Sequence, residues 1–99
     1  MTINKTEENG KISFVLDGKL DTYTAPRLQD VLIPSFDEAK KIELDFTKVS
    51  YVSSSGLRVL LMGQKTAQSK EASMTICCVT EEIREIFKMT GFDTLLTIV

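Results

Sequence analysis

Residues Asp45–Leu61 read DFTKVSYVSSSGLRVLL: a β-type run, then three serines and a glycine, then the start of an amphipathic helix. Hydroxyls at the start of a helix can cap free backbone N–H groups, and the same place can hold a phosphate. The chain has no histidine, and its Lys and Arg residues are scattered rather than clustered. This junction between strand and helix is therefore the first place to look for a function.

Size and composition restrict the class of protein. The 99 residues are 42% hydrophobic and 26% charged, which is typical of one soluble domain over residues 1–99. The net charge of −2 argues against a nucleic-acid partner and against binding to an anionic membrane surface. The aliphatic runs Val59–Met62 and Leu95–Val99 are too short to insert into a bilayer, and the polar segment Met1–Glu8 does not resemble a secretory signal. We therefore expect a cytoplasmic protein.

Hydrophobic periodicity predicts an α/β fold. Alternating apolar residues indicate strands, and apolar residues three or four positions apart indicate helices. Together they predict a mixed β-sheet of four to five strands covered by about three to four helices. We expect strands at Ile3–Thr6, Lys11–Leu16, Lys41–Phe46, Ser73–Val79 and Leu95–Val99, and helices from near Ala25, over Ser54–Gln68 and over Glu81–Met89.

Local signals place several boundaries. The Asn9-Gly10 pair favours a tight hairpin, and we expect Gly18 to break the strand that follows. We expect Thr80 to cap the third helix and Gly91 to end it. The apolar face of the first helix is predicted to contain Leu28, Val31, Leu32 and Phe36, with Pro34 shortening or bending the helix.

The two cysteines are adjacent, at Cys77 and Cys78. Neighbouring side chains of a strand point to opposite faces, so we expect these two thiols to be poorly placed to bond to each other or to share a metal. Free cysteine is often a small buried apolar residue, and that is the role we expect here. The sequence predicts no metal site and no cofactor.

The helix after the serines has two faces at about 100° per residue. We assign one face to the sheet and the other to the surface, where its apolar residues form either a docking stripe or contacts with the first or third helix. The face toward the sheet contains Leu57, Leu60, Gly63, Gln64 and Ala67, and the opposite face contains Ser54, Arg58, Leu61, Met62 and Lys65.

A catalytic serine is disfavoured. Serine hydrolases normally need a general base, most often histidine, and this chain has none. It also lacks a Gly-x-Ser-x-Gly elbow and a Ser-x-x-Lys pair near the loop, and Gly56 alone does not make a nucleotide-binding loop. We therefore predict that the protein is not an enzyme. Two interpretations of the serines remain: capping, which explains one of them, and a modified or partner-facing hydroxyl.

Several segments together resemble the STAS domain family, and more narrowly the stand-alone bacterial anti-sigma-factor antagonists. The resemblance covers nearly the whole chain in the right order. It rests on Leu20–Ala25, Ile42–Phe46, Val49–Leu57 and the tail Thr80–Phe92.

The resemblance implies a binding module controlled by phosphorylation. In this family the antagonist binds an anti-sigma factor with a histidine-kinase-like ATPase fold, which phosphorylates it on a serine, and a cognate phosphatase removes the phosphate. The serine that matches is Ser54. Ser55 matches the hydroxyl residue that follows, and Asp21 matches the acidic residue of the neighbouring loop. The expected partner-binding residues are Asp21, Thr22, Ser53, Ser55, Gly56, Arg58, Leu61 and Met62.

Two positions depart from the family pattern. Phosphorylated members commonly carry Asp immediately before the acceptor, where this chain has Ser53, and many keep a small residue where it has Arg58. A second hypothesis is therefore kept open: a STAS accessory subunit that is not phosphorylated and binds a transport or signalling complex constitutively. The sequence leaves the oligomeric state open.

Overall fold

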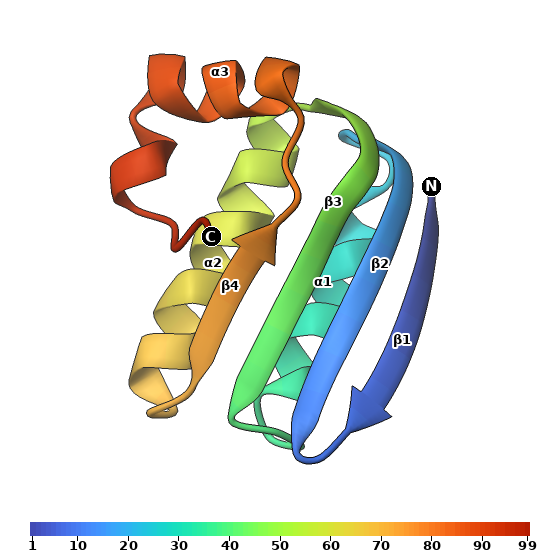
Figure 1. Cartoon of the computed structure of the whole chain (residues 1–99), viewed down its shortest axis with the longest axis vertical. Helices are drawn as coiled ribbons and strands as arrows, with labels where there is room; N and C mark the ends of the chain where they lie inside the picture. Colours follow the sequence, from blue (N-terminus) through green and yellow to red (C-terminus); the bar gives the residue numbers. More distant parts are fainter.

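The computed structural model describes all 99 residues, Met1–Val99. Its centre is a four-stranded sheet in the order β1-β2-β3-β4, in which β1 pairs antiparallel with β2 and the other neighbours are parallel (Figure 1). This confirms the predicted mixed sheet with three helices. The strands are β1 (Thr2–Glu8), β2 (Lys11–Leu20), β3 (Lys41–Val52) and β4 (Ser73–Cys77), and the helices are α1 (Ala25–Ser35), α2 (Ser54–Ser69), α3 (Glu81–Thr90) and the 3-10 turn η1 (Phe92–Thr94).

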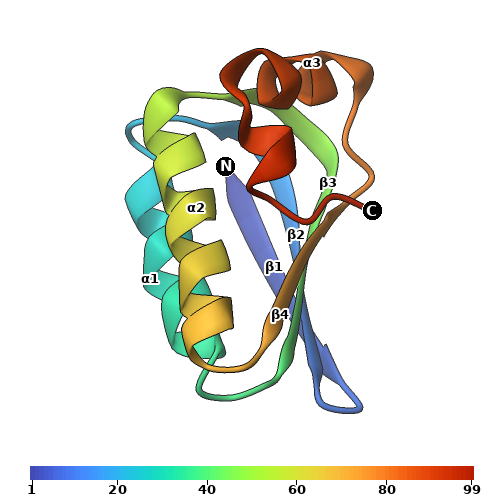
Figure 2. The same cartoon turned by 90° about the vertical axis from the view of Figure 1, so that its left-hand side faces the viewer.

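The helices α1 and α2 form one layer on a single face of the sheet, as Figure 2 shows. The alternation in β3 explains this arrangement, because Ile42, Leu44 and Phe46 are buried on the helix side while Glu43 and Asp45 are only half-buried on the other. Helix α3 lies at the end of the sheet. There the ring of Phe87 packs on that of Phe46, with a centroid distance of 6.2 Å.

The carboxyl ends of β2 and β3 meet at the upper edge of Figure 1. Because these strands are parallel, the helices that follow them, α1 and α2, also begin at this edge. The two junctions are joined directly, since the backbone N–H of Ser53 donates to the carbonyl of Leu20 at 2.8 Å. The loop before α1 and the serines at the start of α2 are therefore neighbours in space. None of the helices has the length and apolar character that a bilayer crossing requires.

Three predictions from Lys11 to Val52 are wrong. Strand β3 continues to Val52, beyond the predicted end at Phe46. Gly18 does not break β2, which continues to Leu20: it has a φ of +118°, which glycine adopts easily, and the strand register shifts beside it. Val31 is 40% exposed and lies outside the apolar face of α1, whose buried stripe runs through Ala25, Leu28, Leu32 and Ser35. Pro34 lies inside α1, in its last turn, and the helix ends one residue later at Ser35.

The C-terminal segment is not the regular strand that we predicted over Leu95–Val99. The turn η1 occupies the preceding residues, and only one bridge, between Ile98 and Ile76 of β4, follows it. The backbone of Ile76 donates to Thr97 and accepts from Val99, each at 2.9 Å. The N–H groups of Leu95 and Leu96 both donate to the carbonyl of Phe92 in this turn, so the first residues of the predicted strand do not pair with β4.

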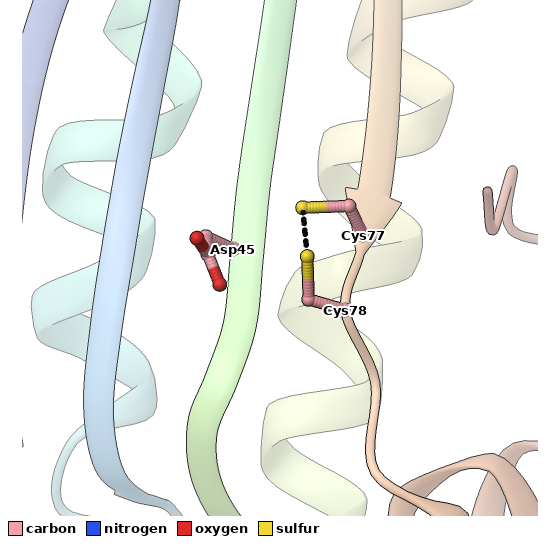
Figure 3. A group of neighbouring side chains, drawn as sticks. All are labelled: Asp45, Cys77 and Cys78. Atoms are coloured by element: carbon pink, nitrogen blue, oxygen red, sulfur yellow. Dashed lines mark hydrogen bonds between the residues drawn. The ribbon is translucent and has the colours of Figure 1, made fainter.

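The prediction that the two thiols point apart is also wrong. Strand β4 ends at Cys77, two residues earlier than predicted, and Cys78 has a left-handed backbone with a φ of +64°. The strict alternation of a strand therefore does not apply to this pair. Both side chains lie on the same side of the chain, and their sulfur atoms are 3.0 Å apart (Figure 3).

Candidate functional site

Ser53 caps helix α2. Its backbone is extended, with φ −86° and ψ 174°, and its Oγ accepts a hydrogen bond from the N–H of Gly56 at 3.2 Å. A serine in this position satisfies one of the backbone donors that the first turn of a helix leaves without a partner. The capping role that we left open for the three serines thus belongs to Ser53.

Ser55 connects α2 to the loop before α1. Its Oγ lies 3.4 Å from the Oγ1 of Thr22, and either hydroxyl can donate. This contact joins residues that are 33 positions apart in the sequence. The structure therefore brings together two of the predicted site residues, one from the first turn of α2 and one from the loop before α1.

Ser54 differs from both of its neighbours. It is the first residue of α2, its side chain is exposed, and its hydroxyl takes part in no hydrogen bond of the structure. The first turn of α2 contains no acidic residue. A free hydroxyl thus lies at the positive end of a helix whose dipole is not compensated by a nearby side-chain carboxylate of that turn.

Asp21 shapes the neighbouring loop. Its Oδ1 accepts hydrogen bonds from the N–H of Thr24 at 3.1 Å, from the N–H of Tyr23 at 2.9 Å and from the Thr24 hydroxyl at 3.2 Å. These bonds favour the charged carboxylate, and the bond from the Thr24 backbone has the largest effect in holding the pKa of Asp21 below its ordinary value. The ionised side chain stabilises the turn that places Thr22 beside Ser55.

Gly56 is buried against the end of β2. A Cβ atom at this position would lie 2.8 Å from the carbonyl oxygen of Leu20 and 2.8 Å from its Cγ. Real Cβ atoms do not approach a backbone oxygen this closely. The glycine therefore allows α2 to begin directly against β2.

The predicted faces of α2 are confirmed. All five residues assigned to the sheet are buried, while Ser54, Arg58, Met62 and Lys65 are exposed and Leu61 is half-buried. The exposed face has a shallow hollow on each side, and Arg58 lines both. The hollow of about 380 Å³ is lined by Ser54, Leu57, Arg58, Leu61, Thr90 and Phe92. The hollow of about 160 Å³ is lined by Thr22, Ala25, Pro26, Gln29, Ser55, Arg58, Val59 and Met62.

These hollows show whether Leu61 and Met62 form a docking stripe or contact the first or third helix, the two alternatives that the sequence left open. Leu61 lies on the side of α3 and η1, and Met62, which is 36% exposed, lies on the side of α1. Each is thus partly covered and partly available. Thr90, Phe92, Pro26 and Gln29 also line these hollows and were not predicted, because the periodicity of one helix does not show which residues of other helices lie beside it.

The comparisons with known proteins point to one family. The STAS domain model matches residues 2–99. The anti-sigma-B factor antagonist of Staphylococcus epidermidis is 32% identical over 80 residues, which cover 80% of this chain and 74% of that protein. The anti-sigma-B factor antagonist of Listeria monocytogenes is 25% identical over 95 residues, covering 95% and 83%.

The solved structures show the same fold. The phosphorylated form of the Bacillus cell fate determinant SpoIIAA superposes with a TM-score of 0.77 at 14% identity, over 99% of this chain and 91% of that one. At this identity the similarity establishes the fold alone.

Proposed function

Because the chain belongs to the STAS domain family, we propose that it is an anti-sigma factor antagonist, and that phosphorylation of Ser54 switches off its binding. The relatives from Staphylococcus epidermidis and Listeria monocytogenes bear the name of anti-sigma-B factor antagonists. The binding face is the exposed side of α2 with the loop before α1. Asp21, Thr22, Ser53, Ser55 and Gly56 shape this face, and Arg58, Leu61 and Met62 extend it.

The observation that supports the proposal best is that the three serine hydroxyls differ in their hydrogen bonding. Ser53 is engaged as a cap and Ser55 contacts Thr22, so neither hydroxyl is free. The Ser54 hydroxyl is exposed and unbonded at the first position of the helix. A kinase can reach it without disturbing a contact that stabilises the fold.

The partner we propose is an anti-sigma factor with a histidine-kinase-like ATPase fold, in the cytoplasm. In the phosphoryl transfer, the Ser54 oxygen forms a bond to the γ-phosphorus of ATP, the bond from that phosphorus to the bridging oxygen breaks, and ADP leaves. The hydroxyl proton is released. A cognate phosphatase then hydrolyses the phosphoserine and restores the binding form.

The phosphate changes the interface more than the fold. It adds a charge of about −1.5 to −2 at neutral pH. The helix N-terminus accommodates negative charge with a gain of about 0.3–1 kcal/mol, and Arg58, one turn along the same face, offers a charge-assisted hydrogen bond. Against a desolvated or acidic partner surface the same charge costs several kcal/mol, and each ~1.4 kcal/mol weakens binding tenfold.

The test is a pull-down from native cytoplasm with four baits: the wild type, Ser54→Ala, Ser54→Asp and, as a matched control, Ser69→Asp. Ser69 is an exposed serine at the opposite end of α2, so its substitution adds the same charge away from the proposed switch. We expect a kinase-like protein to be retained by the wild type, Ser54→Ala and Ser69→Asp and to be lost by Ser54→Asp. Incubation with ATP should then phosphorylate the wild type at Ser54, which mass spectrometry of the peptide shows.

Retention of the same partner by all four baits would contradict the switch and favour the constitutive accessory subunit. Circular dichroism of each bait checks that the fold is intact. We expect the free energy of unfolding of Ser54→Asp to lie within about 0.5 kcal/mol of the wild-type value, as for ordinary surface substitutions. Loss of folding in this variant would contradict the exposed position of Ser54.

A further inference from the structure

We propose that Cys77, Cys78 and Asp45 form a binding site for one thiophilic divalent cation, Zn²⁺, on the sheet face opposite to α1 and α2. Figure 3 shows the three side chains at the end of β4 and on the neighbouring strand β3. Their ligand atoms, two sulfurs and a carboxylate oxygen, all lie within 4.8 Å of one another. The site is independent of the serines and of the proposed antagonist function.

Two separate features of the backbone bring these groups together. Asp45 is the register partner of Cys77 in the parallel pair β3–β4, so their side chains point to the same face of the sheet. Cys78 follows with its left-handed backbone, which turns its thiol back toward that of Cys77 rather than to the opposite face. Neither sulfur takes part in a disulfide.

The carboxylate is already oriented. Its Oδ1 accepts hydrogen bonds from the Thr47 hydroxyl at 2.6 Å and from the Thr47 N–H at 2.9 Å. These two bonds fix the orientation of the carboxylate and leave its other oxygen, Oδ2, without a hydrogen-bond partner in the protein. Partners of this kind fix the direction of a metal ligand and are a recurring part of metal sites.

Two thiolates and a carboxylate favour Zn²⁺ among the common divalent ions. Soft sulfur ligands select zinc over magnesium or calcium, and zinc accepts a carboxylate and a water to complete a tetrahedron. Tetrahedral Zn–S bonds place two sulfurs about 3.8 Å apart, so the present separation of 3.0 Å must widen slightly. Cys78 is exposed, and a small rotation of its side chain provides this change.

Coordination to zinc deprotonates a thiol outright. Binding therefore forms two Zn–S bonds and releases two protons, with no change in oxidation state.

A disulfide between the two cysteines fits the geometry less well. The Cα atoms of adjacent residues are about 3.8 Å apart across a trans peptide, whereas disulfides usually join Cα atoms about 4.4–6.8 Å apart. A metal ion bridges the two sulfurs without bringing them into a covalent bond. The neighbouring carboxylate also has a role in a metal site and none in a disulfide.

The test is titration of the reduced, metal-free protein with Zn²⁺ alone, with the bound ion measured by competition against a chromophoric chelator. We expect one ion per chain and the release of two protons per ion. Cys77→Ser and Cys78→Ser should each weaken binding by about 100-fold, and Asp45→Asn and Thr47→Val by about tenfold. Co²⁺ in place of Zn²⁺ should give sulfur-to-cobalt charge-transfer absorption that both serine variants reduce.

Glu43→Gln is the matched control. Glu43 is the preceding carboxylate on the same face of β3, but it is paired with Lys11 at 3.0 Å. We expect this variant to bind Zn²⁺ like the wild type, and circular dichroism shows that each variant is folded. The proposal is overturned if the wild type binds no ion, if the serine variants bind as tightly as the wild type, or if one ion is bound per two chains.

Discussion

Helices α2 and α3 begin with the same cap but with different charges. Ser53 and Thr80 both have extended backbones, and their hydroxyl oxygens accept from the N–H three residues later at 3.2 Å and 3.3 Å. The first turn of α3 contains Glu81 and Glu82, whereas the first turn of α2 contains hydroxyls and no acid. The dipole of α3 is thus compensated by its own sequence, and that of α2 is left able to accept an added anion.

The two helices also differ at their third residue, and the largest effects should appear there. Gly56 occupies this position in α2 and Ile83 in α3. Gly56→Ala should lower the free energy of unfolding by about 2–3 kcal/mol, because the added methyl overlaps the Leu20 carbonyl. Ile83→Ala should lower it by about 2–5 kcal/mol through the opposite change, a cavity in the core. Urea denaturation followed by circular dichroism measures both.

Gly10→Ala is the control for Gly56→Ala, because it adds backbone strain without steric overlap. Gly10 has a φ of +78°, but a Cβ there meets no atom within 4 Å, so its substitution should cost only about 1–2 kcal/mol. Ile83→Ala should leave partner binding intact once the protein is folded. If Gly56→Ala is as stable as the wild type, this would contradict the close packing of the start of α2 against the end of β2.

The caps themselves should be equivalent. Ser53→Ala and Thr80→Ala each remove one side-chain acceptor, and each should lower the free energy of unfolding by about 1 kcal/mol. The same urea titrations measure this. A much larger loss for Ser53→Ala would mean that this serine stabilises more than the helix start. Ser53→Asp keeps an acceptor and should restore the stability.

Substitutions that add or remove a negative charge at the two helix starts should have opposite effects on stability. Ser54→Asp adds the anion that α2 lacks and should stabilise the protein by up to about 0.5 kcal/mol, while Glu81→Gln removes one from α3 and should destabilise it by about 0.3–1 kcal/mol. Both effects should shrink at high salt, which screens exposed charges. Denaturation at low and at high ionic strength checks this. If Ser54→Asp is destabilising at low salt, the dipole of α2 is already compensated.

The same two helices show what the sequence can predict. The bounds of α3 follow from local signals, since Thr80 caps it and Gly91 ends it with a φ of +78°. Which serine caps α2 depends on the hydrogen bond from the Ser53 N–H to the Leu20 carbonyl. These two residues lie far apart in the sequence, so no local signal reveals the cap. The position of the Cys78 thiol could not be predicted for a related reason: β4 ends at Cys77, two residues before the predicted end at Val79, and no local signal reveals the left-handed backbone of Cys78.

The smallest effect concerns the loop beside the start of α2, where Asp21 is the carboxylate. Its pKa is lower in the folded protein than the ordinary value of 3.8, chiefly because the Thr24 N–H donates to it. The ionised group therefore contributes stability at pH values above 3.8, and this contribution disappears as the pH falls through the lowered pKa. Asp21→Asn should be less stable than the wild type at neutral pH, and the difference should vanish in acid. A difference that is constant over the whole pH range would mean that the loop depends on the shape of the side chain and not on its charge.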